Sequence, residues 1–268
     1  MKNTQDIMKR LEEGVSGVFQ SDNFKAYLET MGKFHNYSFG NCVLIAMQKP
    51  DATQVAGFKA WKDKFKRTVK KGEKGIQIIA PCPHKRKIET DGEEKEVVFT
   101  TYRAAYVFDI SQTEGEELPE ILHKLSFDVA GYDELMEKLM SVSPVKVEFE
   151  DIRDGANGYY SHAENRIAIQ QGMSQSQTIK TLVHEIAHSI LHNKVDGLQK
   201  DADRRAMEVQ AESVSYAVNS YLGIDTSEYS FGYVAGWSSG KDIKEPKNSL
   251  EVIHNTAVGI ITDLEKVA

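Results

Sequence analysis

Residues 175–192 read QSQTIKTLVHEIAHSILH, and this stretch decides the architecture of the second half of the chain. Its apolar side chains recur every three or four positions, which predicts one long amphipathic helix. The apolar stripe consists of Ile179, Leu182, Val183, Ile186, Ile190 and Leu191. The segment HEIAH at 184–188 places three polar side chains in this apolar helix and gives the first indication of function.

HEIAH places His184 and His188 four residues apart, on one face of the predicted helix. Both imidazoles can therefore bind one metal ion, and Glu185 can reach a water on that ion. In zinc peptidases with this HExxH arrangement the glutamate takes a proton from the water. Buried histidines can also serve hydrogen bonding alone. Burying two histidines and a glutamate among apolar residues is costly without a cation, however, so we expect a Zn²⁺ site with Glu185 as its catalytic residue.

A third ligand must come from outside HEIAH. His192 lies eight residues beyond His184, about 12 Å along the helix axis, which is too far for both to bind one ion. The next predicted helix, at about 202–222, contains MEVQAES with Glu208 and Glu212 four residues apart. We favour Glu208 as the ligand and Glu212 as a residue that orients a ligand histidine, with the reverse assignment and two solvated carboxylates as alternatives.

The strand predicted at 165–170 comes shortly before the metal-binding helix. We expect it to be the edge strand that borders the groove, where an extended peptide could add by backbone pairing. Tyr159, Tyr160 and His162 lie just upstream and could donate a hydrogen bond to an oxyanion, although each is more often a packing or turn residue.

Composition and charge suggest two halves with different tasks. The chain has 268 residues, 40% hydrophobic and 27% charged, which is ordinary for globular proteins. Its net charge is -7, but residues 1–125 hold a net +2 and residues 126–268 a net -9. Residues 59–74 alone contain eight Lys and Arg against two acidic residues. We therefore expect one domain at 1–125 and a second at 126–268, with EGEE at 114–117 opening the linker.

The remaining periodic segments indicate an α+β fold in both halves. A hairpin is expected around Asp91 and Gly92, and Trp61 is expected in the core of a short helix that also carries Phe58 and Phe65. We predict helices at 3–31 (one or two), 36–48, 57–67, 132–141 and 248–266, and strands at 75–80, 102–108 and 145–149.

The basic stretch of the first half has features that suit single-stranded DNA. Such binding needs positive charge and aromatic faces for stacking. Lys70, Lys71 and Lys74 lie around a glycine turn, and Tyr37 and Phe39 could stack on bases. A solvated charged face is the alternative reading of the lysines.

Several segments resemble a known family, the ArdC-type antirestriction proteins of conjugative and other mobile elements. The first half is similar to their N-terminal domain in FHNYSFGNCVLIAMQ (34–48), VKKGEKGIQIIAP (69–81) and YVFDISQTEG (106–115). The second half is similar to the zincin-like metallopeptidase domain that accompanies it, in GYYSHAENRIAIQ (158–170), LVHEIAHSILH (182–192) and EVQAE (208–212).

The resemblance implies an N-terminal domain that binds single-stranded DNA and a gluzincin-like domain with two His and one Glu on zinc. It also draws Asn41, in the FGN part of the first segment, into the set of expected DNA contacts. We thus expect a protein that protects DNA during conjugative transfer. A regulatory peptidase that cleaves a repressor or another protein, and a DNA-binding protein with an inactive structural zinc site, are the alternatives.

Cysteine content and hydropathy indicate in which cellular compartment the protein is expected. Cys42 and Cys82 cannot form a disulfide framework, which favours a reducing compartment. No stretch reaches the 18 to 20 apolar residues of a membrane helix, and the charged start MKNTQDIMKR does not look like a secretory signal. We therefore expect a cytoplasmic protein without a membrane partner.

Overall fold

A computed structural model gives the architecture of the chain. The structure describes residues 2–18, 21–90, 93–118, 129–153, 155–193, 201–227, 229 and 244–267. Within these ranges no helix is both long and apolar enough to cross a membrane.

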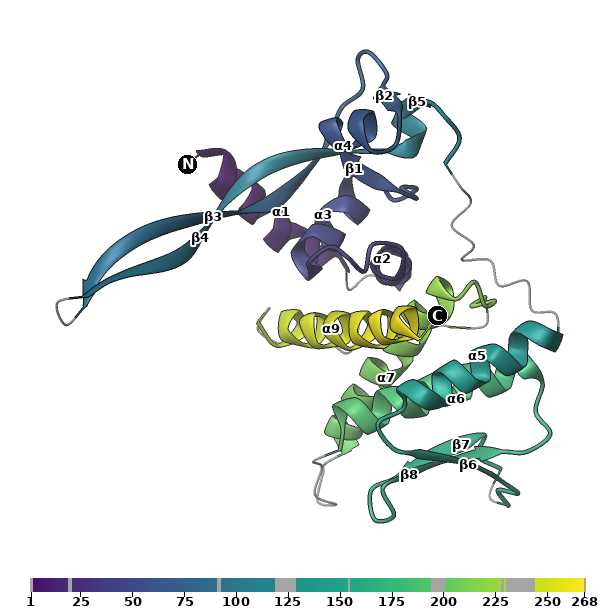
Figure 1. Ribbon diagram of the computed structural model, residues 1–268. Helices are drawn as coiled ribbons and strands as arrows, with labels where there is room; N and C mark the ends of the chain where they lie inside the picture. Colours follow the sequence, from purple (N-terminus) through teal and green to yellow (C-terminus); the bar gives the residue numbers. More distant parts are fainter. Residues whose placement is uncertain are drawn as a thin grey trace. The chain divides into compact units, whose positions relative to one another are not determined.

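The chain divides into two compact units (Figure 1). Unit 1 comprises residues 1–18 and 40–119, and unit 2 comprises residues 19–39 and 120–268. Segment 19–39 thus packs with the second half of the chain, although it lies early in the sequence. The boundary expected after Leu125 falls outside the described residues, so that position stays a prediction.

Unit 1 combines three helices with two small sheets. Its elements are α1 (Lys2–Val18), α3 (Phe39–Gln48, of which Phe39 belongs to unit 2), β1 (Val55–Gly57), α4 (Phe58–Asp63), β2 (Arg67–Val69), β3 (Ile76–Thr90), β4 (Glu93–Asp109), the 3₁₀ turn η1 (Ile110–Gln112) and β5 (Thr113–Gly115). The strand orders are β1-β4-β3 and β2-β5. The mixture confirms the α+β class expected for this half.

A long antiparallel hairpin dominates unit 1. Strands β3 and β4 pair from Ile76–Val107 to Thr90–Glu93, and Figure 1 shows the twisted ribbon that results. The predicted pairing of these two strands is confirmed, and both strands are longer than expected. The turn expected at Asp91 and Gly92 lies outside the described residues.

Side chains of α3 complete the free edge of β3. The Asn41 amide donates to the Ile79 carbonyl and accepts from the Ile79 N–H, both at 2.9 Å. Gln48 makes the same pair of bonds to Gln77, again both at 2.9 Å. Two amide side chains therefore replace a neighbouring strand and satisfy backbone groups that would otherwise lack partners.

The segments KGEKG (71–75) and QTEG (112–115) are joined by hydrogen bonds. The Gln112 amide donates to the Glu73 carboxylate and the Lys74 carbonyl, each at 2.9 Å. Gly115 has a φ of +138°, and a Cβ at this position would lie 2.6 Å from the Lys66 carbonyl oxygen. Only glycine fits this close approach of β5 to the preceding turn.

Trp61 anchors α4, as its periodicity predicts. Its side chain is 1% exposed and its indole N–H donates to the Phe108 carbonyl at 2.8 Å. The predicted helix over 57–67 is shorter than expected, because α4 ends at Asp63 and β2 begins at Arg67. As a result Phe58 and Phe65 are 55% and 38% exposed instead of forming one buried stripe with Trp61.

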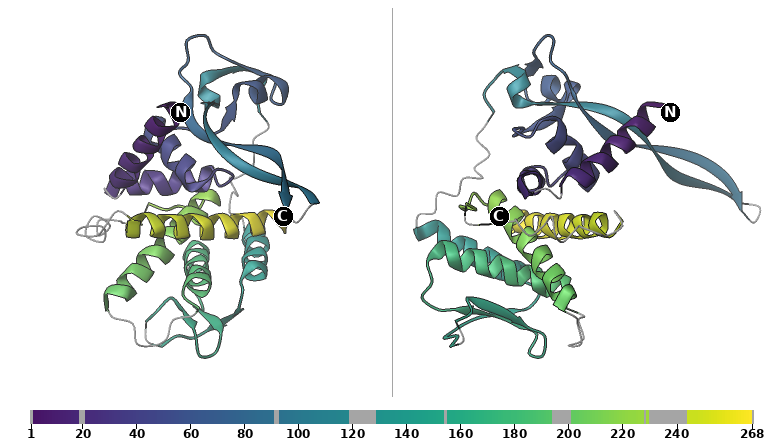
Figure 2. Two further views of the ribbon diagram at one scale, coloured as in Figure 1. Left: turned by 90° about the vertical axis from the view of Figure 1, so that its left-hand side faces the viewer. Right: turned by 180° about the vertical axis from the view of Figure 1, so that it is seen from behind.

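Unit 2 packs helices on a three-stranded sheet. Its elements are α2 (Ser21–Lys33), α5 (Val129–Val142), β6 (Lys146–Glu150), β7 (Gly158–Ser161), β8 (Arg166–Gln170), α6 (Gln175–Leu191), α7 (Asp201–Tyr221) and α9 (Lys244–Lys266). Helix α6 contacts both α7 and strands β7 and β8 (Figure 2). This helix-and-sheet arrangement confirms the α+β class expected for this half.

The sheet of unit 2 has the order β6-β8-β7. Strand β8 is central, parallel to β6 and antiparallel to β7. The expectation that the strand at 165–170 is the edge strand was wrong: Ile167, Ala168 and Ile169 are fully buried between two neighbours. Strand β7, which was not predicted from the sequence, is one of the two edge strands of this sheet, and it contacts α6.

Helix α7 is covered along most of its length by α2, α6 and α9. Glycine at 32 lets α2 approach closely, because a Cβ there would lie 2.7 Å from the Ala217 carbonyl oxygen. The tight packing of α7 against α6 fixes the spacing between the carboxylates of one helix and the histidines of the other.

Candidate metal centre

Three predicted ligand side chains converge between α6 and α7. The Nε2 atoms of His184 and His188 are 3.0 Å apart. The Oε2 atom of Glu208 lies 3.5 Å from each of them. These residues form the one cluster of three or more His, Cys, Asp or Glu in the described chain whose ligand atoms are close enough to hold a metal ion.

The shape of this triangle fits a small divalent cation. Ligand atoms placed tetrahedrally at about 2.0–2.1 Å from zinc are separated by roughly 3.3–3.5 Å, close to the three distances given above. Two nitrogens and one carboxylate oxygen are also a donor set that zinc accepts. The residues present therefore fit a divalent metal ion with three protein ligands and an open fourth position.

Glu212 fixes the tautomer of His184. Its Oε2 atom lies 3.3 Å from Nδ1 of His184, on the opposite side of the ring from Glu208. A carboxylate only accepts, so Nδ1 carries a proton, and Nε2 is the nitrogen that a cation could bind once it replaces the proton there. This geometry matches the assignment favoured from the sequence, in which Glu208 is the metal ligand and Glu212 orients His184.

A hydrogen-bonded chain fixes the tautomer of His188 in the same way. The Gln210 amide donates to Ser249 Oγ at 3.3 Å, and its oxygen faces His192 Nε2 at 3.2 Å. His192 Nε2 therefore donates, and its Nδ1 accepts from His188 Nδ1 at 3.0 Å. This leaves His188 Nε2 unprotonated and directed at the metal position.

His192 was excluded as a ligand from its spacing. In the structure it contacts Nδ1 of His188, whereas Glu208 lies at Nε2 of the same ring. Its role in orienting His188, and that of Gln210, was missed. The four-residue spacing of His188 and His192 could have suggested it, since that spacing places both rings on one helix face.

The electrostatics of the cluster favour positive charge. Burial alone would lower the pKa of His184, but the carboxylates of Glu208 and Glu212 outweigh it and raise the pKa to about 10. The same contacts with His184 and His188 hold the pKa of Glu208 well below its usual range. In the protein without metal a proton offsets these carboxylates, and a divalent cation would replace it.

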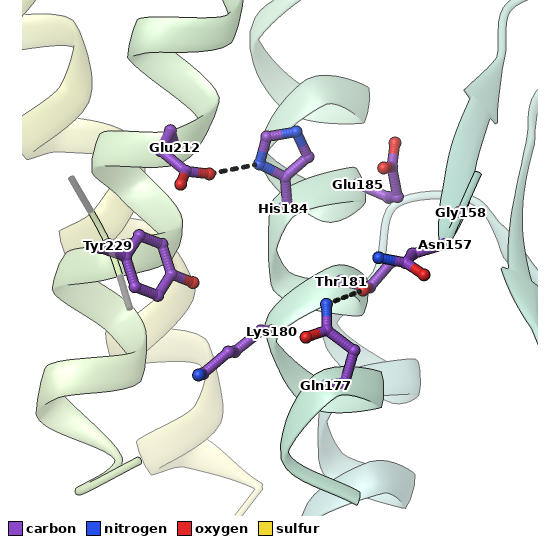
Figure 3. A pocket seen from close by; sticks show the side chains of 9 residues that line it. All are labelled: Asn157, Gly158, Gln177, Lys180, Thr181, His184, Glu185, Glu212 and Tyr229. Atoms are coloured by element: carbon purple, nitrogen blue, oxygen red, sulfur yellow. Dashed lines mark hydrogen bonds and ion pairs between the residues drawn. The ribbon is translucent and has the colours of Figure 1, made fainter. Parts of the chain in front are cut away.

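Glu185 is placed beside this cluster and not in it. Its side chain is 7% exposed, and burial raises the pKa of its carboxyl group, opposed by the charges of the two histidines. It lines two cavities, together with His184 and Gly158 of the edge strand. Figure 3 shows the first, of about 290 Å³, with Glu185 and His184 side by side on α6. The second, of about 440 Å³, also contains His188 and Glu208.

The candidate oxyanion donors lie near the site, but their side chains are engaged elsewhere. Tyr159 and Tyr160 line the larger cavity from β7. The Tyr159 hydroxyl donates to Glu150 at 2.7 Å, and the Tyr160 hydroxyl lies 3.5 Å from Asn165 Oδ1. The His162 ring is exposed and stands 4.6 Å from the Tyr160 ring.

The residues expected to contact DNA are divided between the two units. Tyr37 and Phe39 belong to unit 2, and Phe39 is 7% exposed against Tyr27 and His254, so the expectation that it stacks on bases conflicts with its burial. Asn41 is equally buried and uses both ends of its amide on β3, which gives it a structural task in place of the expected DNA contact.

The three lysines remain on the surface of unit 1. Lys71 and Lys74 are exposed, and exposed Lys70 donates to the Ser111 carbonyl at 3.0 Å. The structure adds exposed aromatic side chains that the sequence analysis left unassigned. Tyr102 is 62% exposed and Tyr106 is 53% exposed, on one face of β4. Phe108 continues this face and meets the ring of Phe58 at 6.2 Å.

The fold and the cluster define a two-part protein with a zincin-like metal-binding unit. Residues 2–108 match the model of the N-terminal domain of anti-restriction factor ArdC, and residues 141–229 match the IrrE N-terminal-like domain of the Peptidase_M78 family. In this pair of domains the chain resembles the ArdC-type antirestriction proteins.

The chain is also similar to individual proteins. An uncharacterized protein of Bacillus anthracis, pXO2-81, is 28% identical over 98% of this chain. The chain spans about half of that relative, 51% of its length. The metal-free crystal structure of the antirestriction ArdC protein from plasmid R388 aligns with a TM-score of 0.52 and 22% identity, over 86% of this chain and 84% of that one. This likeness shows a shared fold. The Mn(II)-bound structure of the same protein aligns with a TM-score of 0.48 and 16% identity, over 86% and 83% of the two chains.

Proposed function

We propose that unit 2 is a zinc-dependent peptide hydrolase and that unit 1 binds single-stranded DNA, so that the protein protects DNA during transfer between cells. The observation that carries the first part is the convergence of the Nε2 atoms of His184 and His188 on Oε2 of Glu208. Glu212 and His192 face the Nδ1 atoms of the same two rings, which leaves Nε2 as the nitrogen that would bind a cation. His184, His188 and Glu208 would hold the ion.

Three ligands and adjoining cavities favour a catalytic site over a purely structural one. Structural zinc sites are closed by four protein ligands, whereas catalytic sites keep one position open. A bound Zn²⁺ would acidify a water and polarise a carbonyl. Glu185 takes the proton from the attacking water and later gives it to the leaving amine, and its raised pKa suits this exchange. Strand β7 offers its free edge to an extended peptide.

The DNA-binding part rests on the exposed aromatic face of β4. Tyr102 and Tyr106 lie on that face, and Phe58 follows at the start of α4. Exposed lysines of the same unit follow Phe58 in the sequence and supply positive charge, namely Lys59, Lys62, Lys64, Lys70, Lys71 and Lys74. Rings for stacking and lysines for phosphates are what sequence-independent binding of single strands needs.

We also propose a cytoplasmic location, where transferred DNA meets restriction enzymes. Both Cys42 and Cys82 are free thiols, as expected in a reducing compartment.

A plasmid-transfer assay into a restricting host tests the proposal. Glu185→Gln removes the proton acceptor, and the double variant Tyr102→Ala/Tyr106→Ala removes the rings. Loss of protection in the tyrosine variant alone indicates DNA shielding without proteolysis. Loss in the Glu185 variant alone favours a regulatory peptidase that cleaves a protein target. Wild-type protein that gives no protection would contradict the antirestriction role.

A further inference from the structure

The outer part of the β3–β4 hairpin is a two-stranded ribbon that lacks cover on both faces. Residues 97–103 of β4 are all exposed, and their side chains point alternately to the two faces. Val98 is 58% exposed and Phe99 is 46% exposed, one on each face. Figure 1 shows this part of the ribbon extending away from the helices of unit 1. Two strands alone are marginally stable in water, so a third strand would stabilise this ribbon.

One edge of the ribbon, that of β3, is protected against pairing with another strand. The backbone groups of Gln77 and Ile79 point outward from this edge and are occupied by two side-chain amides of α3. The next two positions that point outward are Pro81 and Pro83, which have no N–H to donate. Prolines on an edge strand are a common device against edge-to-edge pairing, so the β3 edge is closed.

The opposite edge, that of β4, has no such protection beyond the short strand β1. The alternation of the ladder makes the backbone groups of four residues on its outer part point outward, namely Val98, Thr100, Tyr102 and Ala104. No described residue of unit 1 forms a backbone hydrogen bond to this part of the edge. The segment VVFTTYRAAY at 97–106 has no proline or glycine, and its charged residue is Arg103 alone. An exposed, apolar edge of this kind is a site for pairing with another strand.

We propose that the open edge of β4 pairs with the same edge of a second copy of this chain, antiparallel and about a twofold axis at Val98. In this register Val98 lies opposite Val98 of the second copy, in a hydrogen-bonded pair. Val97 lies opposite Phe99 of the second copy, and the symmetry repeats this pair on the other side of the axis. Pairs of aromatic and β-branched residues stabilise neighbouring strands, so the sequence of this edge is complementary to itself.

The ends of the pairing also fit this register. Glu93 of each copy lies opposite Arg103 of the other, so residues of opposite charge meet at both ends. The pairing then stops short of Val107, where β1 already occupies the edge of β4. A register shifted further toward the base of the hairpin would bring the second copy against β1.

The protected edge of β3 favours a second copy over an unrelated strand as the partner. Two copies joined through β4 form a four-stranded sheet with the order β3-β4-β4-β3, and both outer edges of this sheet are closed. The assembly therefore stops at two chains, whereas an unrelated strand would leave its own second edge open. The axis is perpendicular to the sheet, so Tyr102 and Tyr106 of both copies lie on one face. This would enlarge the surface proposed for single-stranded DNA, but the dimer does not depend on that proposal.

Sedimentation equilibrium of the full-length protein without DNA tests the assembly. Wild type should approach the mass of two chains as its concentration rises. Thr100→Pro removes an N–H that points away from β3, so it costs the dimer a hydrogen bond from each copy and costs the hairpin none. It should weaken dimerisation at least about tenfold, whereas the control Thr100→Val keeps the N–H and should dimerise like wild type. Thermal melting checks that the proline variant is folded. A mass of one chain at every concentration, or a dimer that Thr100→Pro leaves unchanged, would overturn the proposal.

Cysteine cross-linking tests the register and does not require the proline variant to fold. Val98→Cys, in a Cys82→Ser background, would face its counterpart across the axis at a Cα separation of about 5.5 Å, which a disulfide can span. Thr100→Cys in the same background is the control, because the two copies of this exposed position would lie roughly 14 Å apart. We expect mild oxidation to link Val98→Cys into a covalent dimer and to leave Thr100→Cys largely unlinked. Equal linkage of the two variants, or no linkage of Val98→Cys, would overturn pairing about Val98.

Discussion

The Nδ1 atoms of His188 and His192 lie 3.0 Å apart, and this contact decides which nitrogen of His188 can bind a metal. His192 is neutral because burial lowers its pKa to about 4. Its Nε2 faces the Gln210 oxygen, so its Nδ1 is left to accept from His188. The ligand nitrogen of His188 is therefore set by a residue that cannot itself reach the metal.

Replacing His192 should weaken metal binding without removing a ligand. We expect His192→Phe and Gln210→Leu each to lower Zn²⁺ affinity about 10- to 100-fold, as is typical for partners of ligand histidines. Competition with a chelating dye measures this. His84→Phe, in unit 1, is the matched control and should leave affinity unchanged. Unaltered affinity in both site variants would mean that the hydrogen-bonded chain does not orient His188.

The exposed tyrosines of β4 should matter for DNA and not for stability. We expect Tyr102→Ala and Tyr106→Ala each to cost about 1–3 kcal/mol of binding to a labelled single-stranded oligonucleotide, the usual value of one stacked base. Fluorescence anisotropy at two salt concentrations measures it, and affinity should fall as salt rises. Val98→Ala, on the same ribbon but without a ring, is the control. If all three variants bind like wild type, the stacking face lies elsewhere.

Asn41 should contribute to stability through its bonds to β3. Asn41→Ala leaves the partly buried N–H and carbonyl of Ile79 without these partners, which we expect to lower the free energy of unfolding by about 1–3 kcal/mol. Urea unfolding of the full chain would show this. The exposed Asn193→Ala should change stability by less than about 0.5 kcal/mol. A stable Asn41→Ala protein with weakened DNA binding would restore the DNA-contact role.

A buried histidine in unit 2 should make stability depend on pH. Burial lowers the pKa of His254 to about 4, opposed by a hydrogen bond to the Tyr37 backbone. The unfolded chain, with a histidine pKa near 6.5, then binds the proton more tightly than the folded one. The contribution of His254 to the free energy of unfolding should therefore be constant above about pH 6.5 and fall toward pH 4, by up to about 3 kcal/mol.

Comparison of metal-free wild type with His254→Leu isolates that contribution, because His192 titrates in both proteins. The variant should lose less stability between pH 6.5 and 4. Parallel stability curves for the two proteins would show that His254 does not titrate as its burial requires.

The candidate metal centre was predictable because the spacing of residues within two single helices determines which side chains share a face. A four-residue spacing on an apolar helix places His184 and His188 together, and the same spacing on the next helix presents Glu208 and Glu212. Which carboxylate faces which ring nitrogen depends on the packing of α6 against α7, so the sequence could only favour one assignment.

Other features depend on contacts between distant segments. Edge strand β7 has four residues, too few for a periodic signal, and its position follows from pairing with β8. Phe39 and Asn41 have the residue types of a DNA-binding surface, but tertiary contacts bury both. The sequence predicts a strand at 102–108 but not which face of it is covered, so the exposure of Tyr102 and Tyr106 follows only from the tertiary structure.

Metal analysis of the purified protein tests the central claim most directly. Elemental analysis after dialysis against Zn²⁺ should give one equivalent per chain for wild type and for Glu185→Gln, and much less than one for His184→Ala, His188→Ala and Glu208→Ala. Wild-type protein without bound metal, or ligand variants that retain a full equivalent, would contradict the assignment of His184, His188 and Glu208 as the metal centre.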